Sequence, residues 1–383
     1  MMNSVAHRGP DGEGLLQWEN CFLGHRRLAI LDTTSAGHQP MSYKHYDIIF
    51  NGEIYNYIEL AKELTALGHV FRTKCDTEVL LHSFEEWGWS CLERFVGMWA
   101  FVILNRKTRK VFCARDRFGI KPFYYVDNAE NFLFASEIKA LLAAGTAAKA
   151  NPDALLTYLA FGNENSGHDS FFQGVQQLAP GCCAWIDLLS GQMDISRYYK
   201  LQKAGADESN WDSYECLLRN SVQLRLRSDV PVATCLSGGL DSSTIAAIAS
   251  DIYHKDSLNT FGAVTAKSQV KKTDESHFAK QVVEHCGLEW HVVEPTYEDF
   301  RNNIEMCLYC QDEPVDGMSI FMQYWVMKSA SGAGYKVMLD GQGGDESLMG
   351  YARYYSTYFG DLLRGFELLP QQGNMLWRQN TQV

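Results

Sequence analysis

The sequence contains no apolar run close to the roughly 20 residues that span a bilayer. Its first eight residues also lack the long apolar stretch of a signal peptide. Basic residues are in the minority, because 34 Lys and Arg stand against 46 Asp and Glu, for a formal net charge of -12. Binding to a phosphate backbone normally requires a basic surface. We therefore expect a cytoplasmic protein that binds neither membranes nor nucleic acids.

Disulfide bonds are not expected either. The 11 cysteines are an odd number and lie in apolar surroundings, as Cys113 and Cys235 do, which suits small buried thiols in a reducing compartment. Cys307 and Cys310 have the spacing of a zinc or redox pair, but no second pair lies nearby and the segment is helical in pattern. We interpret them as structural residues.

A length of 383 residues favours two domains. Short apolar runs separated by Asn, Gly and Asp turns fill the first half, and two segments with helical spacing, 57–64 and 78–84, interrupt them. The pattern is typical of an α+β layered domain. The predicted strands are 21–31, 46–50, 98–104, 110–114, 123–126 and 132–135.

The second half has a different rhythm. A polar stretch at 203–210 suits a linker, so we expect one domain over residues 1–200 and another over 208–383. Strands and helices alternate after it, which predicts an α/β doubly wound parallel sheet. The predicted strands are 232–236, 258–263, 289–293 and 336–339, and the predicted helices between them include 211–226, 241–253 and 275–286.

The segment CLSGGLDSSTIAA, residues 235–247, joins a predicted strand to a predicted helix. Ligands bind at this edge of an open α/β sheet, adjacent glycines let the backbone approach them, and amides at a helix start favour phosphate. The loop lacks the Gly-Lys-Ser/Thr ending of a P-loop. Asp241 would repel phosphate, so we expect it to act through a divalent cation. The alternative is an ordinary tight turn with Asp241 as a helix cap.

A second loop repeats this arrangement. In VMLDGQGGDES, residues 337–347, an apolar strand is followed by glycines and then by Asp345 before a predicted helix start. Two carboxylate-bearing, glycine-rich loops at strand ends predict a clamp for a metal and a pyrophosphate group.

The motif SGGLDSS resembles the pyrophosphatase loop of N-type ATP pyrophosphatases such as the asparagine synthetases. The first half is similar to their class II glutamine amidotransferase domain, through RGPDG at 8–12, HRRLAILD at 25–32, FNGEIYN at 50–56, DTEV at 76–79 and ARDRFGIKP at 114–122. The motifs follow in the order of the family and cover most of the chain. The resemblance implies an Ntn-hydrolase-like amidotransferase domain before the parallel-sheet synthetase domain.

The activity implied by the resemblance has two steps. ATP activates the side-chain carboxylate of aspartate as an aspartyl adenylate, and ammonia derived from glutamine attacks it. A carboxylate is a poor electrophile until its oxygen becomes part of a leaving group, and ammonia must travel through a dry passage to stay unprotonated. The implied ligands are ATP, Mg²⁺, aspartate and glutamine, and a homodimer is an expectation from the family.

Site residues of the first half also follow from the resemblance. Arg27 would pair with the α-carboxylate of glutamine and Asp76 with its α-ammonium. Asn51 and Gly52, expected on a turn after a strand, would supply the oxyanion donors, with Glu53 in contact with the substrate. The alternatives are surface ions for Arg27 and Asp76 and a hairpin turn for Asn-Gly.

In the second half the resemblance assigns one set to ATP and another to the metal. Gln342 is a candidate catalytic residue that stands where several relatives have glutamate. The strand residues among the ATP set are equally consistent with plain core positions. The predicted ATP-binding residues are Cys235, Leu236, Ser237, Gly238, Gly239, Asp241, Ser242, Ser243, Ala263, Val264, Asp340 and Gly341, and the predicted metal ligands are Asp241 and Asp345.

The chain departs from the family pattern at both ends. The family's nucleophile is an amino-terminal cysteine whose own α-amine is the base, and this sequence begins Met1-Met2-Asn3, so we expect no glutamine hydrolysis. It also ends soon after residue 355, before the family's helices that shape the acceptor pocket. The alternatives are a β-lactam-synthetase-like enzyme, an amide ligase for a different carboxylate, or a catalytically silent nucleotide-binding fragment.

Overall fold

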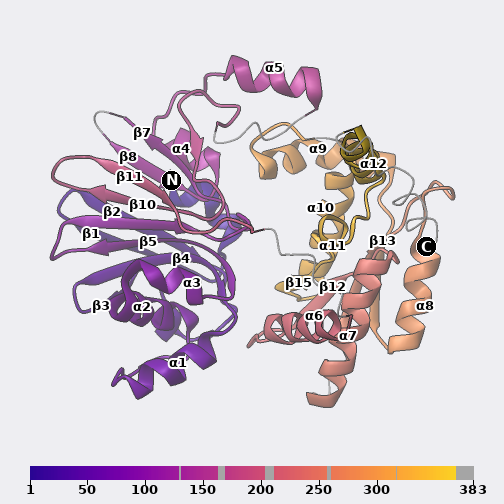
Figure 1. The fold of residues 1–383 in the computed structure, drawn as a ribbon, viewed down its shortest axis with the longest axis horizontal. Helices are drawn as coiled ribbons and strands as arrows, with labels where there is room; N and C mark the ends of the chain where they lie inside the picture. Colours follow the sequence, from indigo (N-terminus) through magenta and orange to yellow (C-terminus); the bar gives the residue numbers. More distant parts are fainter. Residues whose placement is uncertain (129–130, 163–168, 203–210, 257–259, 316, 368–383) are drawn as a thin grey trace.

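The structure is a computed structural model that describes residues 1–128, 131–162, 169–202, 211–256, 260–315 and 317–367. Figure 1 shows two bodies, an indigo-to-magenta half rich in strands and an orange half in which helices surround a smaller sheet. The predicted linker at 203–210 and the first two residues of the predicted strand 258–263 lie outside the described residues.

A six-stranded antiparallel sheet forms the centre of the first half, in the order β11-β10-β6-β5-β4-β3. Alternate residues of its central strands face opposite sides, so that Phe101 and Ile103 join one hydrophobic cluster while Val102 and Leu104 join the other. Both faces are therefore covered, which explains the nearly continuous apolar runs. The strands are β3 Met41–Tyr43, β4 Tyr46–Ile54, β5 Gly97–Asn105, β6 Lys110–Arg115, β10 Cys182–Asp187 and β11 Met193–Arg197.

Helices cover one face of this sheet and small sheets cover the other. Phe84 and Leu80 of α2 pack in the first cluster, whereas Leu23 of β2 and Tyr125 of β7 pack in the second. The helices of this half are α1 Tyr57–Ala66, α2 Asp76–Trp87, α3 Cys91–Arg94, α4 Ile138–Ala143 and α5 Pro152–Phe161. The small sheets are the hairpin of β1 Gly12–Trp18 with β2 Cys21–Arg27, and the sheet of β7 Tyr124–Asp127, β8 Phe132–Ala135 and β9 Gln176–Gln177. Short 3-10 helices are η1 Met2–Arg8, η2 Ser35–Gly37 and η3 Gly88–Ser90.

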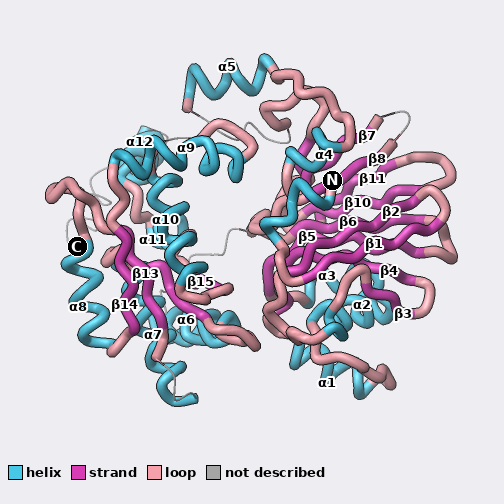
Figure 2. Tube along the Cα trace, turned by 180° about the vertical axis from the view of Figure 1, so that it is seen from behind, coloured by secondary structure: helices cyan, strands magenta, loops and turns pink. Residues whose placement is uncertain are grey.

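Figure 2 shows the smaller sheet of the second half, with β13, β14 and β15 labelled, among its helices. The sheet has four strands in the order β14-β13-β12-β15, and every pair in it is parallel. Ala246 and Ala249 of α7 pack on one face, and Val326 and Ala330 of α10 pack on the other. The predicted doubly wound fold is thus confirmed. Its strands are β12 Val232–Cys235, β13 Gly262–Ala266, β14 Glu289–Val293 and β15 Val337–Leu339. Its helices are α6 Trp211–Arg225, α7 Leu240–Asp256, α8 Ser276–Cys286, α9 Tyr297–Gln311, α10 Ser319–Gly332, α11 Gly344–Leu348 and α12 Ala352–Glu367.

The strand order locates the crevice of this sheet. The chain runs outward from β12 through β13 to β14 and then returns to the other side of β12 as β15. The order therefore reverses between β12 and β15, and ligands of open α/β sheets bind beyond the carboxyl ends of the strands at such a point. The two glycine-rich loops leave the sheet at these two strand ends.

Several sequence interpretations can be compared directly with the structure. All eleven cysteines are free, and Cys307 and Cys310 lie on α9. Among the described residues, no group of three or more His, Cys, Asp or Glu side chains is arranged to hold a metal ion. Within the same residues, no helix is both long enough and apolar enough to cross a bilayer. The predicted strand 21–31 ends earlier, at Arg27.

A buried ionic cluster joins the two halves. Lys139, at the start of α4, places Nζ 3.0 Å from Oδ1 of Asp312, which caps the carboxyl end of α9, and also donates to Glu137. Oδ2 of Asp312 accepts from the backbone N–H of Ile138 at 2.7 Å. Elsewhere Arg227 donates to Glu59 from both Nη atoms. Contacts between charged groups of the two halves thus fix one face of α9 against α4.

Acid is expected to destabilise the protein through His82. This residue of α2 is fully buried, stacks on Tyr43 at 3.9 Å between ring centroids, and has Nδ1 3.0 Å from Nδ1 of His69. Burial lowers the pKa of His82 to about 4 from 6.5. The unfolded chain therefore takes up a proton first, and stability is lost as the pH falls from about 6.5 to 4, by about 2 kcal/mol at pH 5.

Urea unfolding of wild type and His82→Phe at pH 7.5 and pH 5 measures this effect. The variant should lose less stability between the two pH values than the wild type. Burial also lowers the pKa of His25 to about 4. This residue should therefore preserve part of the pH dependence of stability in both proteins. An equal loss in the two proteins would contradict the assignment to His82.

Candidate functional site

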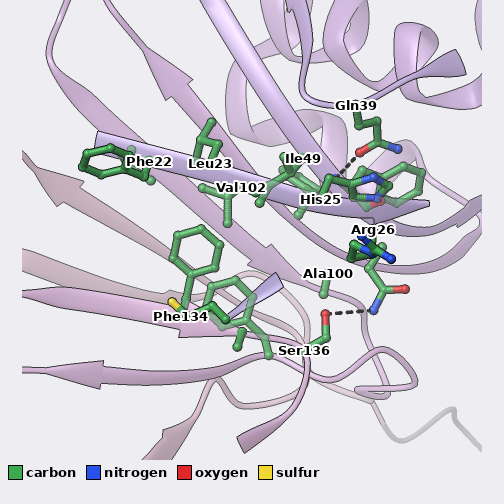
Figure 3. A pocket seen from close by; sticks show the side chains of 18 of the residues that line it. Phe22, Leu23, His25, Arg26, Gln39, Ile49, Ala100, Val102, Phe134 and Ser136 are labelled. Carbon is green, nitrogen blue, oxygen red and sulfur yellow. Dashed lines mark hydrogen bonds between the residues drawn. The ribbon is translucent and has the colours of Figure 1, made fainter. Parts of the chain in front are cut away.

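A cavity of about 1010 Å³ lies in the first half, between β2, β8 and the central strands. Figure 3 shows its apolar end, where Phe22, Leu23, Val102 and Phe134 gather, and its other end beside Gln39 and Ser136. The four residues predicted to bind glutamine, Arg27, Asn51, Glu53 and Asp76, all line this cavity, as does the predicted oxyanion donor Gly52. The structure therefore brings together residues that lie up to 49 positions apart in the chain, 76 − 27.

Arg27 ends β2 and is buried, with its guanidinium held by a loop. Its Nη1 donates to the carbonyl of Thr34 at 2.6 Å, and its Nη2 donates to the carbonyls of Leu31 and Asp32. A side chain at position 37 would collide with Nη2, so Gly37 is required for this packing. Three of the five N–H groups of the guanidinium are thus used by the backbone, which fixes the orientation of the side chain. Arg27 is not a surface ion.

Asn51 and Gly52 lie inside β4, not on a turn after it. Asn51 pairs with Ala100 and Gly52 with Trp99 of β5, and the ladder continues to Ile54. The expected turn is therefore wrong, because pairing with β5 outweighs the local turn preference of Asn-Gly. A Cβ at position 52 would lie 2.2 Å from the carbonyl oxygen of Met98, so only glycine fits there. The Asn51 amide donates to Oγ of Ser136 at 3.4 Å.

Glu53 and Asp76 form a buried acidic pair. Asp76, the first residue of α2, accepts from the backbone N–H of Ile54 at 2.9 Å. Burial raises the pKa of Asp76 to about 6. Burial, together with the charge of Asp76, raises the pKa of Glu53 well above its usual value, which Lys121 partly offsets. A ligand that brings an ammonium group would relieve this repulsion.

The thiols of the cavity are not activated. Cys21 and Cys75 both line it. Burial raises the pKa of Cys21 to about 11 and that of Cys75 to about 12. The thiolate is the nucleophilic form, so neither residue has the depressed pKa of a catalytic cysteine.

The first loop of the second half is tightly folded. Oγ of Ser237 and Oγ of Ser242 are 3.0 Å apart, and the N–H of Gly239 donates to Oγ of Ser237 at 3.2 Å. Gly238 has a φ of +92° and would carry its Cβ 2.7 Å from the backbone nitrogen of Ala279. Oγ of Ser243 is buried and has no hydrogen-bond partner in the described part of the chain.

The second loop lies directly against the first. A Cβ on Gly341 would lie 3.0 Å from the backbone nitrogen of Ser242, and a Cβ on Gly344 would lie 2.5 Å from Cγ of Asp241. The Asp241 carboxylate therefore points at the turn that precedes Asp345. The Asp345 carboxylate itself packs against Gly350, whose Cβ would overlap Oδ1. Gln342 is exposed in this loop.

Of the remaining predicted ATP-binding residues, Cys235, Leu236 and Asp340 lie at or directly after the ends of β12 and β15, whereas Ala263 and Val264 lie inside β13. Cys235, Leu236, Ala263 and Val264 are buried in the two hydrophobic clusters that flank the sheet, and the N–H of Leu236 donates to the carbonyl of Val264 at 2.9 Å. Asp340 accepts from the side-chain amide of Gln323.

Sequence reasoning missed four polar neighbours of these sites. Gln39, Lys121 and Ser136 line the cavity of the first half, and Gln323 contacts Asp340 in the second. Only Lys121 carried a local signal, because it lies inside the motif ARDRFGIKP.

Two of the solved structures that match the chain are enzymes of low sequence identity to it. One is described as the allosteric regulatory enzyme of purine biosynthesis, with 18% identity, a TM-score of 0.39 and coverage of 76% of each chain. The other is glutamine phosphoribosylpyrophosphate amidotransferase from Bacillus subtilis, with 16% identity, a TM-score of 0.40 and coverage of 88% of this chain and 86% of that one.

Sequence comparison is more specific. Residues 1–199 match the model of a glutamine amidotransferase domain, and residues 213–382 match that of asparagine synthase. A putative glutamine-hydrolysing asparagine synthetase of Methanocaldococcus jannaschii is 35% identical over 95% of this chain and 74% of its own length. Asparagine synthetases 3 and 1 of Bacillus subtilis are 32% and 35% identical, and the chain spans 61% and 57% of their lengths. The chain therefore belongs to the family of glutamine-hydrolysing asparagine synthetases, which are ligases.

Proposed function

We propose that this chain is an ATP-dependent amide ligase that activates the side-chain carboxylate of aspartate as an aspartyl adenylate, releases pyrophosphate, and joins ammonia to the acyl group. One observation carries the proposal: the loops after β12 and β15 touch through Gly341, Gly344 and Asp241 at the point where the strand order reverses. This is where an open α/β sheet binds its ligand.

The residues of the first loop suit a triphosphate. Helix α7 begins at Leu240, directly after Gly239, and its first backbone N–H groups and the helix dipole favour phosphate oxygens. The buried hydroxyl of Ser243 has no hydrogen-bond partner among the described residues and would donate to one of these oxygens. Glycines at 341 and 344 keep the space beside Asp241 free of side chains.

Asp241 and Asp345 would hold Mg²⁺. Two carboxylates are a sufficient protein contribution, because Mg²⁺ takes its other ligands from water and substrate phosphates. When bound, the ion would neutralise charge on the departing pyrophosphate. The two carboxylates would hold the ion beside the amino terminus of α7. Gln342, which lies in the same loop as Asp345, would contact the reacting groups.

We also propose the two domains expected from the sequence, 1–200 and 208–383. We assign a glutamine site to the first of them. Arg27 would meet the α-carboxylate of glutamine through its guanidinium charge, and the Glu53–Asp76 pair would meet the α-ammonium. The amide of Asn51 and the N–H of Gly52 would donate to the side-chain carbonyl oxygen of glutamine, which is the oxygen that becomes the oxyanion when glutamine is hydrolysed. A homodimer in the cytoplasm completes the proposal.

The test uses ammonium as the nitrogen donor, so that it does not depend on glutamine hydrolysis. Pyrophosphate release is measured with ATP, Mg²⁺, aspartate and ammonium, with and without each component. We expect release that requires aspartate, and a loss of at least tenfold in Asp241→Asn, because removal of a metal-linked carboxylate weakens electrostatic stabilisation of the transition state.

Asp251→Asn is the matched control, since Asp251 lies on the same helix and pairs with Arg219 at the surface. It should behave like the wild type. Nucleotide binding without any release of pyrophosphate would contradict the proposal and favour a silent nucleotide-binding protein. Release with another carboxylate in place of aspartate would contradict the assigned acceptor alone.

A further inference from the structure

The side-chain amide of Gln323 contacts the carboxyl ends of both β12 and β15 at the crevice. Gln323 lies on α10, and its Nε2 donates to Oδ2 of Asp340 at 3.3 Å and lies 3.7 Å from Sγ of Cys235. Asp340 follows the last residue of β15, and Cys235 is the last residue of β12. One side chain therefore reaches from the helix that covers this face of the sheet to both strands that border the crevice.

The position of Asp340 restricts what its carboxylate can contact. The next residue, Gly341, lies against Ser242 and Asp241 of the phosphate-binding loop. A carboxylate held next to that loop repels phosphate oxygens, because the charges have the same sign. The partners that remain on a nucleotide are the groups with O–H or N–H donors, which are the ribose hydroxyls and the adenine amino group. The ribose hydroxyls are the nearer of these to the phosphates. Carboxylates of other α/β folds accept hydrogen bonds from ribose hydroxyls in the same way.

Gln323 limits how the carboxylate can move. Its amide donates to one carboxylate oxygen, and the adjacent Cys235 is buried at 8% exposure, so the side chain of Asp340 packs against a closed surface. A carboxylate fixed in this way is oriented before the ligand arrives, which reduces the entropic cost of binding. Without the amide, Asp340 could rotate away from the crevice.

We propose that Asp340 accepts a hydrogen bond from a ribose hydroxyl of the nucleotide, and that Gln323 is a positioning residue that holds this carboxylate in place. The pair thereby selects ribonucleotides over deoxyribonucleotides. The inference rests on the proposed function, because it requires ATP at this edge of the sheet.

Selectivity between ATP and its deoxy analogues tests the proposal. In the pyrophosphate assay, wild type should prefer ATP to 2′-deoxy-ATP or 3′-deoxy-ATP by about 10- to 150-fold in kcat/KM, the range for a hydrogen bond to a charged group. Asp340→Ala should no longer prefer ATP to the analogue that lacks the hydroxyl bonded to Asp340. Gln323→Met, which has similar size but no donor, should lose part of it by raising KM for ATP with little change in kcat.

A double-mutant cycle separates positioning from a merely structural role. If Gln323 acts through Asp340, Gln323→Met should have no further effect on selectivity in the Asp340→Ala background. Lys328→Met is the matched control on α10, since Lys328 donates to Asn303 away from the crevice. Its selectivity should equal that of the wild type. Should Asp340→Ala fail to fold, Asp340→Leu keeps the approximate size of the side chain without an acceptor and supplies the same comparison.

Two results would overturn the inference while leaving the proposed function intact. One is an active wild type with no preference for ATP over either deoxy analogue. The other is a rise in KM for aspartate alone in Asp340→Ala, because the carboxylate would then contact the ammonium of the acceptor. Absence of aspartate-dependent release in the wild type would overturn the proposed function and this inference together.

Discussion

Lys139→Met is expected to lower the free energy of unfolding by about 3 kcal/mol, because it leaves buried charge without its partner. The Lys139 side chain is 9% exposed and its Nζ lies 3.0 Å from Oδ1 of Asp312 and within hydrogen-bond distance of Glu137. Methionine keeps the length of the side chain but removes the charge. Arg8 still pairs with Glu137 at 3.0 Å, so the uncompensated charge is chiefly that of Asp312.

Urea unfolding at pH 7.5, followed by tryptophan fluorescence and circular dichroism, measures this change. Lys110→Met is the control, because Lys110 is exposed and 4.0 Å from Asp187, and it should change stability by less than about 1 kcal/mol. The double variant Lys139→Met/Asp312→Asn should recover part of the loss. Since Lys139 and Asp312 belong to different halves, the single variant should also separate the unfolding transitions of the two halves. If Lys139→Met loses no more free energy of unfolding than Lys110→Met, the ionic cluster does not stabilise the contact between the two halves.

Much of the fold could be predicted from the sequence because its determinants are local. Strands β4 to β6 are buried on both faces and read as apolar runs, and the second half alternates strands and helices in the pattern of a parallel sheet. The glycine-rich loops were recognisable for the same reason, since strand, glycines and carboxylate follow one another within about ten residues. The turn predicted at Asn51 and Gly52 is wrong because the pairing of these residues with β5, more than forty residues away in the chain, decides their conformation.

The parts that could not be predicted depend on pairs distant in sequence. Lys139 and Asp312 are 173 positions apart, 312 − 139, and nothing in the local pattern of either indicates the other. The amide of Gln323 likewise finds Asp340 only because α10 packs over the sheet. In the first half, the motifs identified Glu53 and Asp76 separately, but only the fold shows that their charges lie close enough to raise the pKa of Glu53.

Asp76→Asn should stabilise the fold at neutral pH and weaken glutamine binding. Burial raises the pKa of Asp76 from 3.8 to about 6, so the charged form is less stable in the folded protein than in the unfolded chain. The cost is absent below about pH 3.8, grows as the pH rises, and is complete above about pH 6, where it reaches about 3 kcal/mol. Asparagine removes the charge and keeps an oxygen that can accept from the N–H of Ile54.

Urea unfolding at pH 8 and pH 5 and calorimetric titration with glutamine measure the two effects. We expect a gain of about 2–3 kcal/mol at pH 8 and a smaller gain at pH 5, together with at least a tenfold weaker affinity for glutamine, because its α-ammonium loses a buried counter-charge. Asp194→Asn, an exposed change on β11, is the control for both measurements and should change neither. A variant with higher stability but unchanged affinity would place the ammonium elsewhere. One that is less stable at pH 8 would show that the Asp76 carboxylate is neutralised in the folded protein by a group that its hydrogen bonds do not reveal.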